Sequence, residues 1–248
     1  MPSLHVLNPA GNYALPECAL AVMAKAPVAR LVKTRLCPPL TPEQAAALNR
    51  CFLQDISKSI VAAASTTGGC SISVYLPPGS EALFNEILPS QFCLLPQRGD
   101  TLEQRIIAAA EDLFSCGFRH LCLINSDSPT VPGAIFIEAI NTLRQGEAEV
   151  VLGPARDGGY YLIGMRRLHR RLFEEIEWST HRVFQQTLER AKELRLEVYQ
   201  LPTFTDVDDV ASLRLIYDEI CACERDGKES PARQTKRFLN EIMSDAGL

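Results

Sequence analysis

The sequence has no long apolar run and no excess of positive charge. It lacks the roughly 20 consecutive apolar residues of a membrane-spanning helix, and residues 1–16 lack the basic start and apolar core of a signal peptide. The 25 Lys and Arg residues against 30 Asp and Glu give a net charge of −5 at pH 7. Because nucleic acids and membrane surfaces bind basic faces, we expect neither partner. A small anionic substrate held by a few local cations is compatible with this charge.

Disulfide and zinc patterns are also absent. The nine cysteines are scattered and include no Cys-x-x-Cys pair, and the four histidines have no metal-ligand spacing. Neither a disulfide framework nor a zinc site is therefore indicated, and free thiols predict a reducing cytoplasm. No G-x-G-x-x-G follows the first strand and no G-x-x-x-x-G-K-[ST] occurs. A nucleotide, if bound, would need the basic segment Lys25–Arg35.

Short apolar runs alternate with helical patterns along most of the 248 residues. Such alternation predicts an α/β protein with parallel strands and helices on both faces of the sheet. The strands are expected at 18–24, 70–76, 91–95, 120–125, 149–153, 160–164 and 196–201. The helices are expected at 101–114, 132–143, 180–194, 209–221 and 236–243, with one more after Thr41. The glycine-rich turn before 160–164 suggests one antiparallel or mixed element.

The helix after Thr41 has the clearest local signals. Thr41 reads as an N-cap, Pro42 as the first helical residue, and Leu48, Phe52, Ile56 and Ile60 recur every four residues as an apolar stripe. We find no linker and no internal repeat, so we predict a single domain over residues 1–248. Its core would span about 18–222, with 224–248 as a C-terminal appendage.

A basic segment follows the first predicted strand. Ligands of open α/β sheets bind beyond the carboxyl ends of the strands, and here Lys25, Arg30, Lys33 and Arg35 follow such an end. In an extended loop Lys33 and Arg35 would point the same way. Arg35 could then grip phosphate oxygens with two hydrogen bonds, and Lys33 could act as a mobile point charge. A solvated basic loop is the alternative.

Acidic residues follow two other predicted strands. Asp127 comes directly after the most apolar run, where a carboxylate is held in place and reachable by Mg²⁺. Asp206 and Asp208 would fall on the same side of an extended segment and could bind a hard divalent cation. The alternatives are turn hydrogen bonding by Asp127 and capping of the following helix by Asp208 or Asp209.

Two further segments have both functional and structural interpretations. Asp157 precedes paired glycines that could bring the backbone close to a ligand, although Asp-Gly is also the favoured dipeptide of a β-hairpin turn. Trp178, the lone tryptophan, precedes Ser179 and Thr180. Stacking of a ligand on Trp178 is one interpretation, and capping of the next helix by Ser179 or Thr180 is the other, which we favour.

Five ordered motifs resemble a known family. MAKAP…VKTRLCPPLTPEQAAAL, NSDSPT, GPARDGGYYLIG, WST and DVDDVASL, from about Leu20 to Leu213, resemble the DUF2064 family of proposed glycosyltransferases. That family is similar to molybdenum-cofactor guanylyltransferase and 2-phospholactate guanylyltransferase, within the nucleotide-diphospho-sugar transferase superfamily. The resemblance implies a GT-A-like three-layer αβα sandwich with a mostly parallel mixed sheet. The chain departs from the family pattern at Ala29–Leu31, where Pro-Gly-Arg is usual, and at Asn125, where glycine is usual.

The resemblance also implies site residues. Lys33 and Arg35 match the basic loop that wraps phosphates, and Asp127 and Asp208 match the acidic positions that hold Mg²⁺ or Mn²⁺. The expected catalytic residues are Lys33, Arg35 and Asp127, and the expected metal ligands are Asp127 and Asp208. The expected substrate-binding residues are Lys25, Ala26, Pro27, Ser126, Asp157, Gly158, Gly159 and Trp178.

Three functions are compatible with these residues. The first is a glycosyltransferase that moves a sugar from a nucleotide-sugar to a small-molecule acceptor, with Mg²⁺ or Mn²⁺ as cofactor. The second is a nucleotidyltransferase that joins a nucleoside triphosphate to a phosphorylated small molecule and releases pyrophosphate. The Lys33–Arg35 pair suits a triphosphate somewhat better. The third is a nucleotide-binding protein without turnover. The base, the acceptor and the oligomeric state do not follow from the sequence.

Overall fold

One mixed sheet of eight strands organises the chain. The computed structural model describes residues 3–227 and 229–246. The strands are β1 (His5–Val6), β2 (Cys18–Lys25), β3 (Cys70–Leu76), β4 (Phe92–Pro96), β5 (His120–Ile124), β6 (Val150–Pro154), β7 (Tyr160–Met165) and β8 (Val198–Gln200). Their spatial order is β1-β4-β3-β2-β5-β7-β6-β8, and β7 alone among them runs antiparallel to its neighbours. The predicted α/β class and mostly parallel mixed sheet are confirmed.

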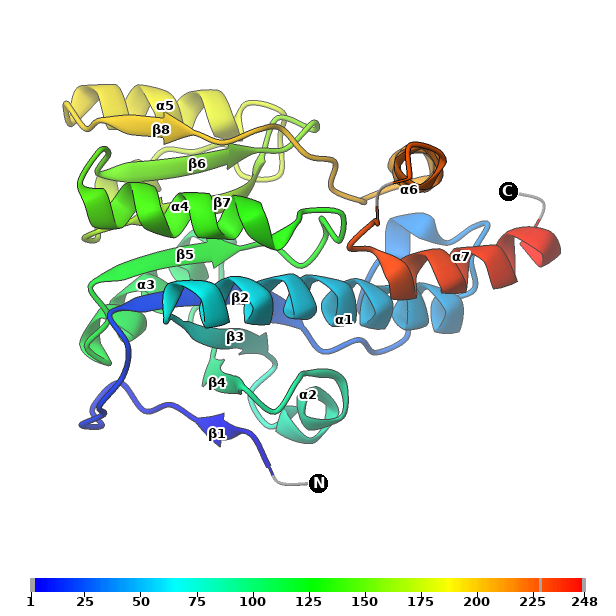
Figure 1. Ribbon diagram of the computed structural model, residues 1–248, viewed down its shortest axis with the longest axis horizontal. Coiled ribbons are helices and arrows are strands. Elements are labelled where there is room, and N and C mark those ends of the chain that lie inside the picture. The colour runs from blue at the N-terminus through cyan, green and yellow to red at the C-terminus, as the bar shows by residue number, and fades with distance from the viewer. Residues whose placement is uncertain (1–2, 228, 247–248) are drawn as a thin grey trace.

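Helices cover both faces of this sheet and extend beyond one edge. They are α1 (Pro42–Thr67), α2 (Glu81–Ile87), α3 (Leu102–Ser115), α4 (Gly133–Gln145), α5 (Val183–Glu193), α6 (Val210–Arg225) and α7 (Arg233–Ala246), with short 3-10 turns η1 (Thr34–Leu36) and η2 (Arg170–Leu172). In Figure 1, α1 and α4 lie on one face and α3 on the other, while α6 and α7 lie beyond the carboxyl ends of the strands. None of these helices is long and apolar enough to cross a membrane.

The central strand β2 shows why the three layers form. Its residues are buried from Cys18 to Val22, and successive side chains point to opposite faces. Leu20 packs in the cluster under α1 and α4, whereas Ala21 packs in the cluster under α3 and α5. A strand covered on both sides must be apolar nearly throughout, and β2 is apolar from Cys18 to Ala24.

The start and the buried face of α1 match the sequence signals. Thr41 accepts a hydrogen bond from the Gln44 backbone N–H at 3.1 Å, and the Gln44 side chain accepts one from Thr41 N–H at 2.8 Å. This reciprocal capping box satisfies two amides that the helix leaves unpaired. The side chains of the predicted stripe are all buried: Leu48, Phe52, Ile56 and Ile60. The prediction of this helix is confirmed.

Some boundaries differ from the sequence-based prediction. The two-residue edge strand β1 and the short helix α2 were not predicted, because neither is long enough to show a period. Helix α5 begins at Val183, not at Thr180. The Thr180 hydroxyl donates to Glu177 O and accepts from Arg182 N–H, and Arg182 is the N-cap residue. The favoured capping interpretation of Ser179 and Thr180 is therefore wrong.

The C-terminal segment is longer and more tightly packed than its polar sequence suggests. Helix α7 begins at Arg233, three residues before the predicted start, and α6 continues to Arg225. Ala232 and Leu239 are buried, and α7 packs against α1 (Figure 1). These two helices therefore lie next to the edge of the sheet at which the sequence places the site.

Candidate functional site

A cleft of about 720 Å³ opens at the carboxyl ends of the strands. It is bordered by the ends of β2 and β5, the turn between β6 and β7, and the segment before α6. Most of the predicted site residues line it: Lys25, Lys33, Arg35, Ser126, Asp127, Asp157, Gly159, Trp178 and Asp208. Three predicted substrate-binding residues, Ala26, Pro27 and Gly158, are not part of its described wall. The topology thus brings together residues more than 170 positions apart in sequence.

Lys33 lies inside the site as a buried cation. Its side chain is 6% exposed, and its Nζ lies 2.8 Å from Asp127 Oδ1 and 3.6 Å from Asp208 Oδ1. The ammonium also donates to the Val207 carbonyl and lies 5.7 Å from the centre of the Phe52 ring. These contacts hold the ammonium between the end of β5 and the segment before α6. The prediction of a mobile point charge is therefore wrong, as is the alternative of a solvated loop at this residue.

Arg35 lies at the rim, in a different environment. Its side chain is 72% exposed, and Nη1 is 3.9 Å from Asp208 Oδ2. The predicted extended loop is not formed, because Lys33 adopts a left-handed conformation with φ 50° and the 3-10 turn η1 follows it. This turn sends Lys33 inward and leaves Arg35 facing solvent. Arg35 is therefore free to reorient toward an anion in the cleft.

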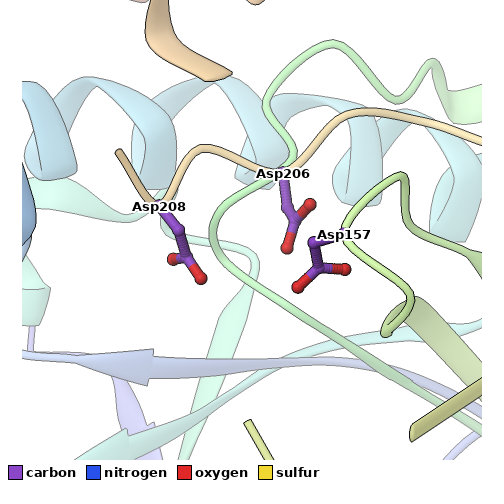
Figure 2. A group of neighbouring side chains, drawn as sticks. All are labelled: Asp157, Asp206 and Asp208. Carbon is purple, nitrogen blue, oxygen red and sulfur yellow. The ribbon is translucent and has the colours of Figure 1, made fainter. Parts of the chain in front are cut away.

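Three carboxylates gather opposite these cations (Figure 2). Asp157, Asp206 and Asp208 each offer an oxygen, and these atoms lie within 4.8 Å of one another. Burial, followed by the Asp157 carboxylate, raises the pKa of Asp206 to about 7. Like charges this close repel each other unless a cation lies between them. Oxygen donors in such a group suit Mg²⁺ or Mn²⁺.

The two neighbouring aspartates before α6 have separate roles. Asp209 is the N-cap residue of α6 and accepts from Ser212 N–H at 2.8 Å. Hydrogen bonds from the Ser212 backbone and side chain lower the pKa of Asp209. Since Asp209 caps the helix, Asp208 is left to face Lys33 and the acidic group. Of the two capping candidates from the sequence, only Asp209 has that role.

Asp127 is placed by the turn that follows β5. Its backbone N–H donates to Asn125 Oδ1 at 3.2 Å, and its Oδ1 accepts from the Ser126 hydroxyl at 3.2 Å. The backbone carbonyl of Asp127 accepts from Val207 N–H at 3.0 Å. The carboxylate of Asp127 therefore faces Lys33. It does not bond the amides of its own turn, which was the alternative considered from the sequence.

In the glycine-rich turn between β6 and β7, Gly158 packs against the segment before α5 and Asp157 exposes its carboxylate. Gly158 has φ +91°, and a Cβ there would lie 2.1 Å from the His181 carbonyl oxygen. Only glycine fits this approach of the hairpin to the segment before α5. Asp157 Oδ1 accepts from Gly159 N–H at 2.7 Å, which orients the exposed carboxylate. Gly158 is therefore a packing residue in this structure, and Asp157 faces the cleft.

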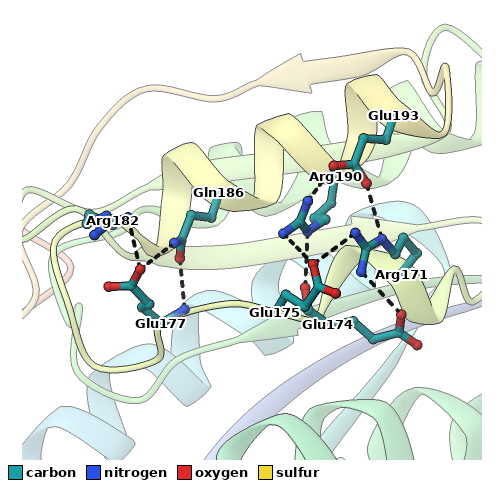
Figure 3. A network of polar contacts seen from close by, with 8 residues as sticks. All are labelled: Arg171, Glu174, Glu175, Glu177, Arg182, Gln186, Arg190 and Glu193. Carbon is teal, nitrogen blue, oxygen red and sulfur yellow. Dashed lines mark hydrogen bonds and ion pairs between the residues drawn. The ribbon is translucent and has the colours of Figure 1, made fainter.

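Trp178 and Tyr160 together form an aromatic part of the cleft wall. Their rings meet edge to face with centres 6.5 Å apart, and both line the cleft. Ion pairs between η2, the loop after it and α5 hold the loop of Trp178 in place (Figure 3). Within that network Glu177 N–H donates to Gln186 Oε1 at 2.8 Å, and Glu177 pairs with Arg182 at 2.9 Å. This wall of the cleft is therefore aromatic.

Several lining residues were missed by sequence reasoning. Asp206 was considered as a metal ligand but was not included in the predicted set. Asn49 is a 4% exposed polar residue of α1 that directly follows the stripe residue Leu48, and the period of the stripe does not mark it as part of the cleft. Gln97 donates to the Ala24 and Val74 carbonyls at the ends of β2 and β3. No local pattern in the sequence marks Gln97.

Comparison with known proteins gives a match along nearly the whole chain. A crystal structure from Desulfovibrio desulfuricans G20, described as a "putative nucleotide-diphospho-sugar transferase", is 30% identical. The match covers 93% of this chain and 97% of that chain, with a TM-score of 0.81. The model of DUF2064, described as "Uncharacterized protein conserved in bacteria", matches residues 60–180. The chain belongs to the DUF2064 family.

More distant structures share the fold of this DUF2064 protein. CMP:2-keto-3-deoxy-manno-octonic acid synthetase, solved in complex with CTP, has a TM-score of 0.54 at 13% identity and covers 84% of this chain and 100% of that one. A cytidylyltransferase from Leptospira borgpetersenii has a TM-score of 0.51 at 10% identity, covering 93% and 95%. No protein with a curated description matches the chain. Family and fold together assign the chain to the transferases, as the motifs predicted.

Proposed function

We propose that this DUF2064 protein is a metal-dependent transferase that moves a sugar from a nucleotide-sugar to a small-molecule acceptor. The observation that carries the proposal is one cleft that holds the carboxylates of Asp157, Asp206 and Asp208 beside the cations of Lys33 and Arg35. A divalent cation and the diphosphate of a nucleotide-sugar need both kinds of side chain at one place. The 30% identical relative described as a nucleotide-diphospho-sugar transferase supports the choice of donor.

The donor set fits Mg²⁺ or Mn²⁺. Asp157, Asp206 and Asp208 would hold the ion through carboxylate oxygens, and when bound it would offset the charge of the departing nucleoside diphosphate. Asp127, one of the two predicted ligands, pairs with Lys33 at 2.8 Å and would have to leave that contact to join the ion.

The state of Lys33 favours a diphosphate over a triphosphate. The sequence suggested two free cations, an arrangement that would suit the larger anion. Lys33 instead has its charge offset by Asp127 and Asp208 and is nearly excluded from solvent. Arg35 is exposed beside the acidic group and can bind two phosphate oxygens at once. The positive charge available to phosphates therefore comes from Arg35, from Lys25 and Arg105, which also line the cleft, and from the metal ion.

The residues of the chain would orient the substrates rather than attack them. The cleft is lined by carboxylates and hydroxyls, to which we assign binding roles; the acceptor oxygen itself would bond to the sugar carbon while the bond between that carbon and the diphosphate oxygen breaks. The proton of the acceptor would pass to solvent or to a carboxylate of the cleft. Tyr160 and Trp178 form an aromatic wall against which a sugar or an acceptor ring can pack.

A thermal-shift experiment with a matched pair of variants tests the proposal. Wild type is heated with UDP-, GDP-, CMP- and dTDP-linked sugars and with the nucleoside triphosphates, each with Mg²⁺, Mn²⁺ or EDTA. We expect metal-dependent stabilisation by a nucleotide-sugar, and release of the nucleoside diphosphate or monophosphate on turnover. Asp208→Asn should lose both effects. Asp209→Asn is the control, since asparagine is an equally good N-cap and Asp209 serves α6.

Other results of this thermal-shift experiment would indicate other functions. Stabilisation by a triphosphate with release of pyrophosphate would instead indicate nucleotidyl transfer. Binding without product from any donor would indicate a nucleotide-binding protein without turnover. No response to any nucleotide, or equal loss in both variants, would refute the site.

We also propose a cellular compartment and a class of acceptor for this reaction. None of the nine cysteines is joined in a disulfide in the described structure, which suits the reducing cytoplasm that we propose as its compartment. The net charge of −5 supports a small-molecule acceptor rather than a nucleic acid.

A further inference from the structure

A third apolar cluster lies outside the sheet, next to the cleft. It joins the first half of α1, the turn η1 and the two C-terminal helices, and its buried members are Leu36, Leu40, Leu48, Phe52, Val207, Leu213, Ile216, Leu239 and Ile242. Figure 1 shows α7 beside the part of α1 that projects beyond the strands. Neither face of the sheet contributes to this cluster. Its integrity therefore depends on the docking of α6 and α7.

A buried carboxylate of α1 fastens α7 in this position. Asp55 is fully buried and accepts from Gln234 N–H at 3.0 Å and Thr235 N–H at 2.8 Å. These amides belong to the first turn of α7, where backbone N–H groups have no partner within the helix. A charged acceptor is especially favourable there. A residue about 180 positions earlier in the chain thus supplies the cap of the last helix.

The same cluster carries the contacts that hold Lys33. Val207 is fully buried in it, and both of its backbone polar groups serve the site. Its N–H donates to Asp127 O at 3.0 Å, and its carbonyl accepts from the Lys33 ammonium. Phe52, from the same cluster, provides the ring beneath that ammonium. A shift of the C-terminal helices would therefore move the position that Lys33 occupies between Asp127 and Asp208.

We propose that α6 and α7 are the support that keeps the Lys33 ammonium between the two carboxylates, with Leu239 and Asp55 as positioning residues. Residues 210–242 then belong to the functional unit, in place of the appendage that the sequence suggested for 224–248. The consequence for ligand affinity rests on the proposed function, whereas the placement of Lys33 does not. Leu239 touches neither substrate nor metal and acts through Val207 and Phe52.

Chemical accessibility of Lys33 tests the placement directly. Reductive methylation followed by peptide mass spectrometry reports how often each amine meets solvent, with the exposed Lys58 and Lys192 as internal references. Leu239→Ala should raise the methylation rate of Lys33 relative to the references by about 10-fold, the change expected when a local opening becomes about 1.4 kcal/mol easier. Leu113→Ala removes an equally buried side chain on the sheet-facing side of α3. It should leave the methylation rate of Lys33 relative to the references unchanged.

Two further variants guard against a simple loss of folding. Leu239→Met should restore the protection of Lys33, because it refills the volume. Asp55 accepts from Gln234 and Thr235 with different oxygens, so Asp55→Asn leaves one of these α7 amides without an acceptor at nearly constant shape and should raise Lys33 methylation in the same direction as Leu239→Ala. Equal Lys33 methylation in Leu239→Ala and Leu113→Ala would overturn the proposal.

Ligand affinity, measured on the same variants, separates this inference from the proposed function. At saturating Mn²⁺, the dissociation constant for the nucleotide-sugar that stabilises wild type should rise several-fold in Leu239→Ala and not in Leu113→Ala, because Asp208 and Arg35 lose the positions that they have beside Lys33. If wild type binds no nucleotide, the proposed function fails, but the methylation ratio still decides the role of α6 and α7. If affinity is unchanged while Lys33 opens, the support is real but the ligand does not depend on it, and the functional part is refuted.

Discussion

Replacement of Lys33 by methionine is the most informative single change in this protein. Methionine keeps an unbranched apolar side chain, one atom shorter, but removes the ammonium that lies 2.8 Å from Asp127, 3.6 Å from Asp208 and over the Phe52 ring. Two carboxylates then face each other and the rest of the acidic group without an internal cation. We expect the metal-free protein to be less stable and the acidic group to bind divalent cations more tightly, because an ammonium no longer competes with them.

The size of the stability loss follows from burial. Removing one partner of a fully buried ion pair costs about 3–5 kcal/mol. Lys33 is nearly excluded from water, but the side chains of Asp127 and Asp208 are 30% and 47% exposed, so water replaces part of the lost interaction. We therefore expect about 2 kcal/mol at pH 8. In a chain of this length that corresponds to roughly 4–8 °C in Tm.

Urea denaturation of EDTA-treated protein at pH 8 and pH 5 measures the effect. The penalty should shrink at the lower pH, because Asp206, whose pKa is raised to about 7, is protonated at pH 5 and no longer repels the uncovered carboxylates. Lys192→Met, which removes an exposed lysine of α5, is the control and should change stability by less than about 0.5 kcal/mol. An equal loss at both pH values would mean that Lys33 contributes packing alone. Weaker binding of Mn²⁺ by the variant would refute the electrostatic account of the site.

Three further predictions concern the acidic group, the hairpin turn and the first helix. Burial and neighbouring carboxylates raise the pKa of Asp206 to about 7 in the folded protein. The stability of the metal-free protein should therefore fall as the pH rises from about 4 to about 7, because the unfolded chain loses the proton first. Asp206→Asn should flatten this fall and raise the Tm at pH 8. Gly158→Ala should cost about 2–4 kcal/mol, since its Cβ would meet the His181 carbonyl at a φ of +91°, whereas Gly159→Ala should cost less in the same urea titration. Thr41→Ala should cost about 1 kcal/mol by loss of the capping box, and an unchanged free energy of unfolding would contradict that role.

Local patterns in the sequence were enough for most of the helices and strands, though not for β1 and α2, and for the edge of the sheet at which the candidate site lies. A capping box or a stripe such as Leu48–Ile60 involves neighbours within a turn or two, so the sequence alone contains all its partners. The fully apolar run of β5 likewise predicts a strand covered on both faces. Since parallel strands end at one edge, residues that follow them, such as Asp127, can be assigned to the site from their position in the sequence.

Contacts between distant segments were decided by the tertiary structure alone. The order β1-β4-β3-β2-β5-β7-β6-β8 places the end of β2 beside the end of β5, and only then does Lys33 meet Asp127. The left-handed turn at Lys33 reversed the predicted geometry of the basic loop. The cap that Asp55 provides for α7 joins residues about 180 positions apart. No periodicity or propensity contains such pairs, because their energy depends on which surfaces the finished sheet brings together.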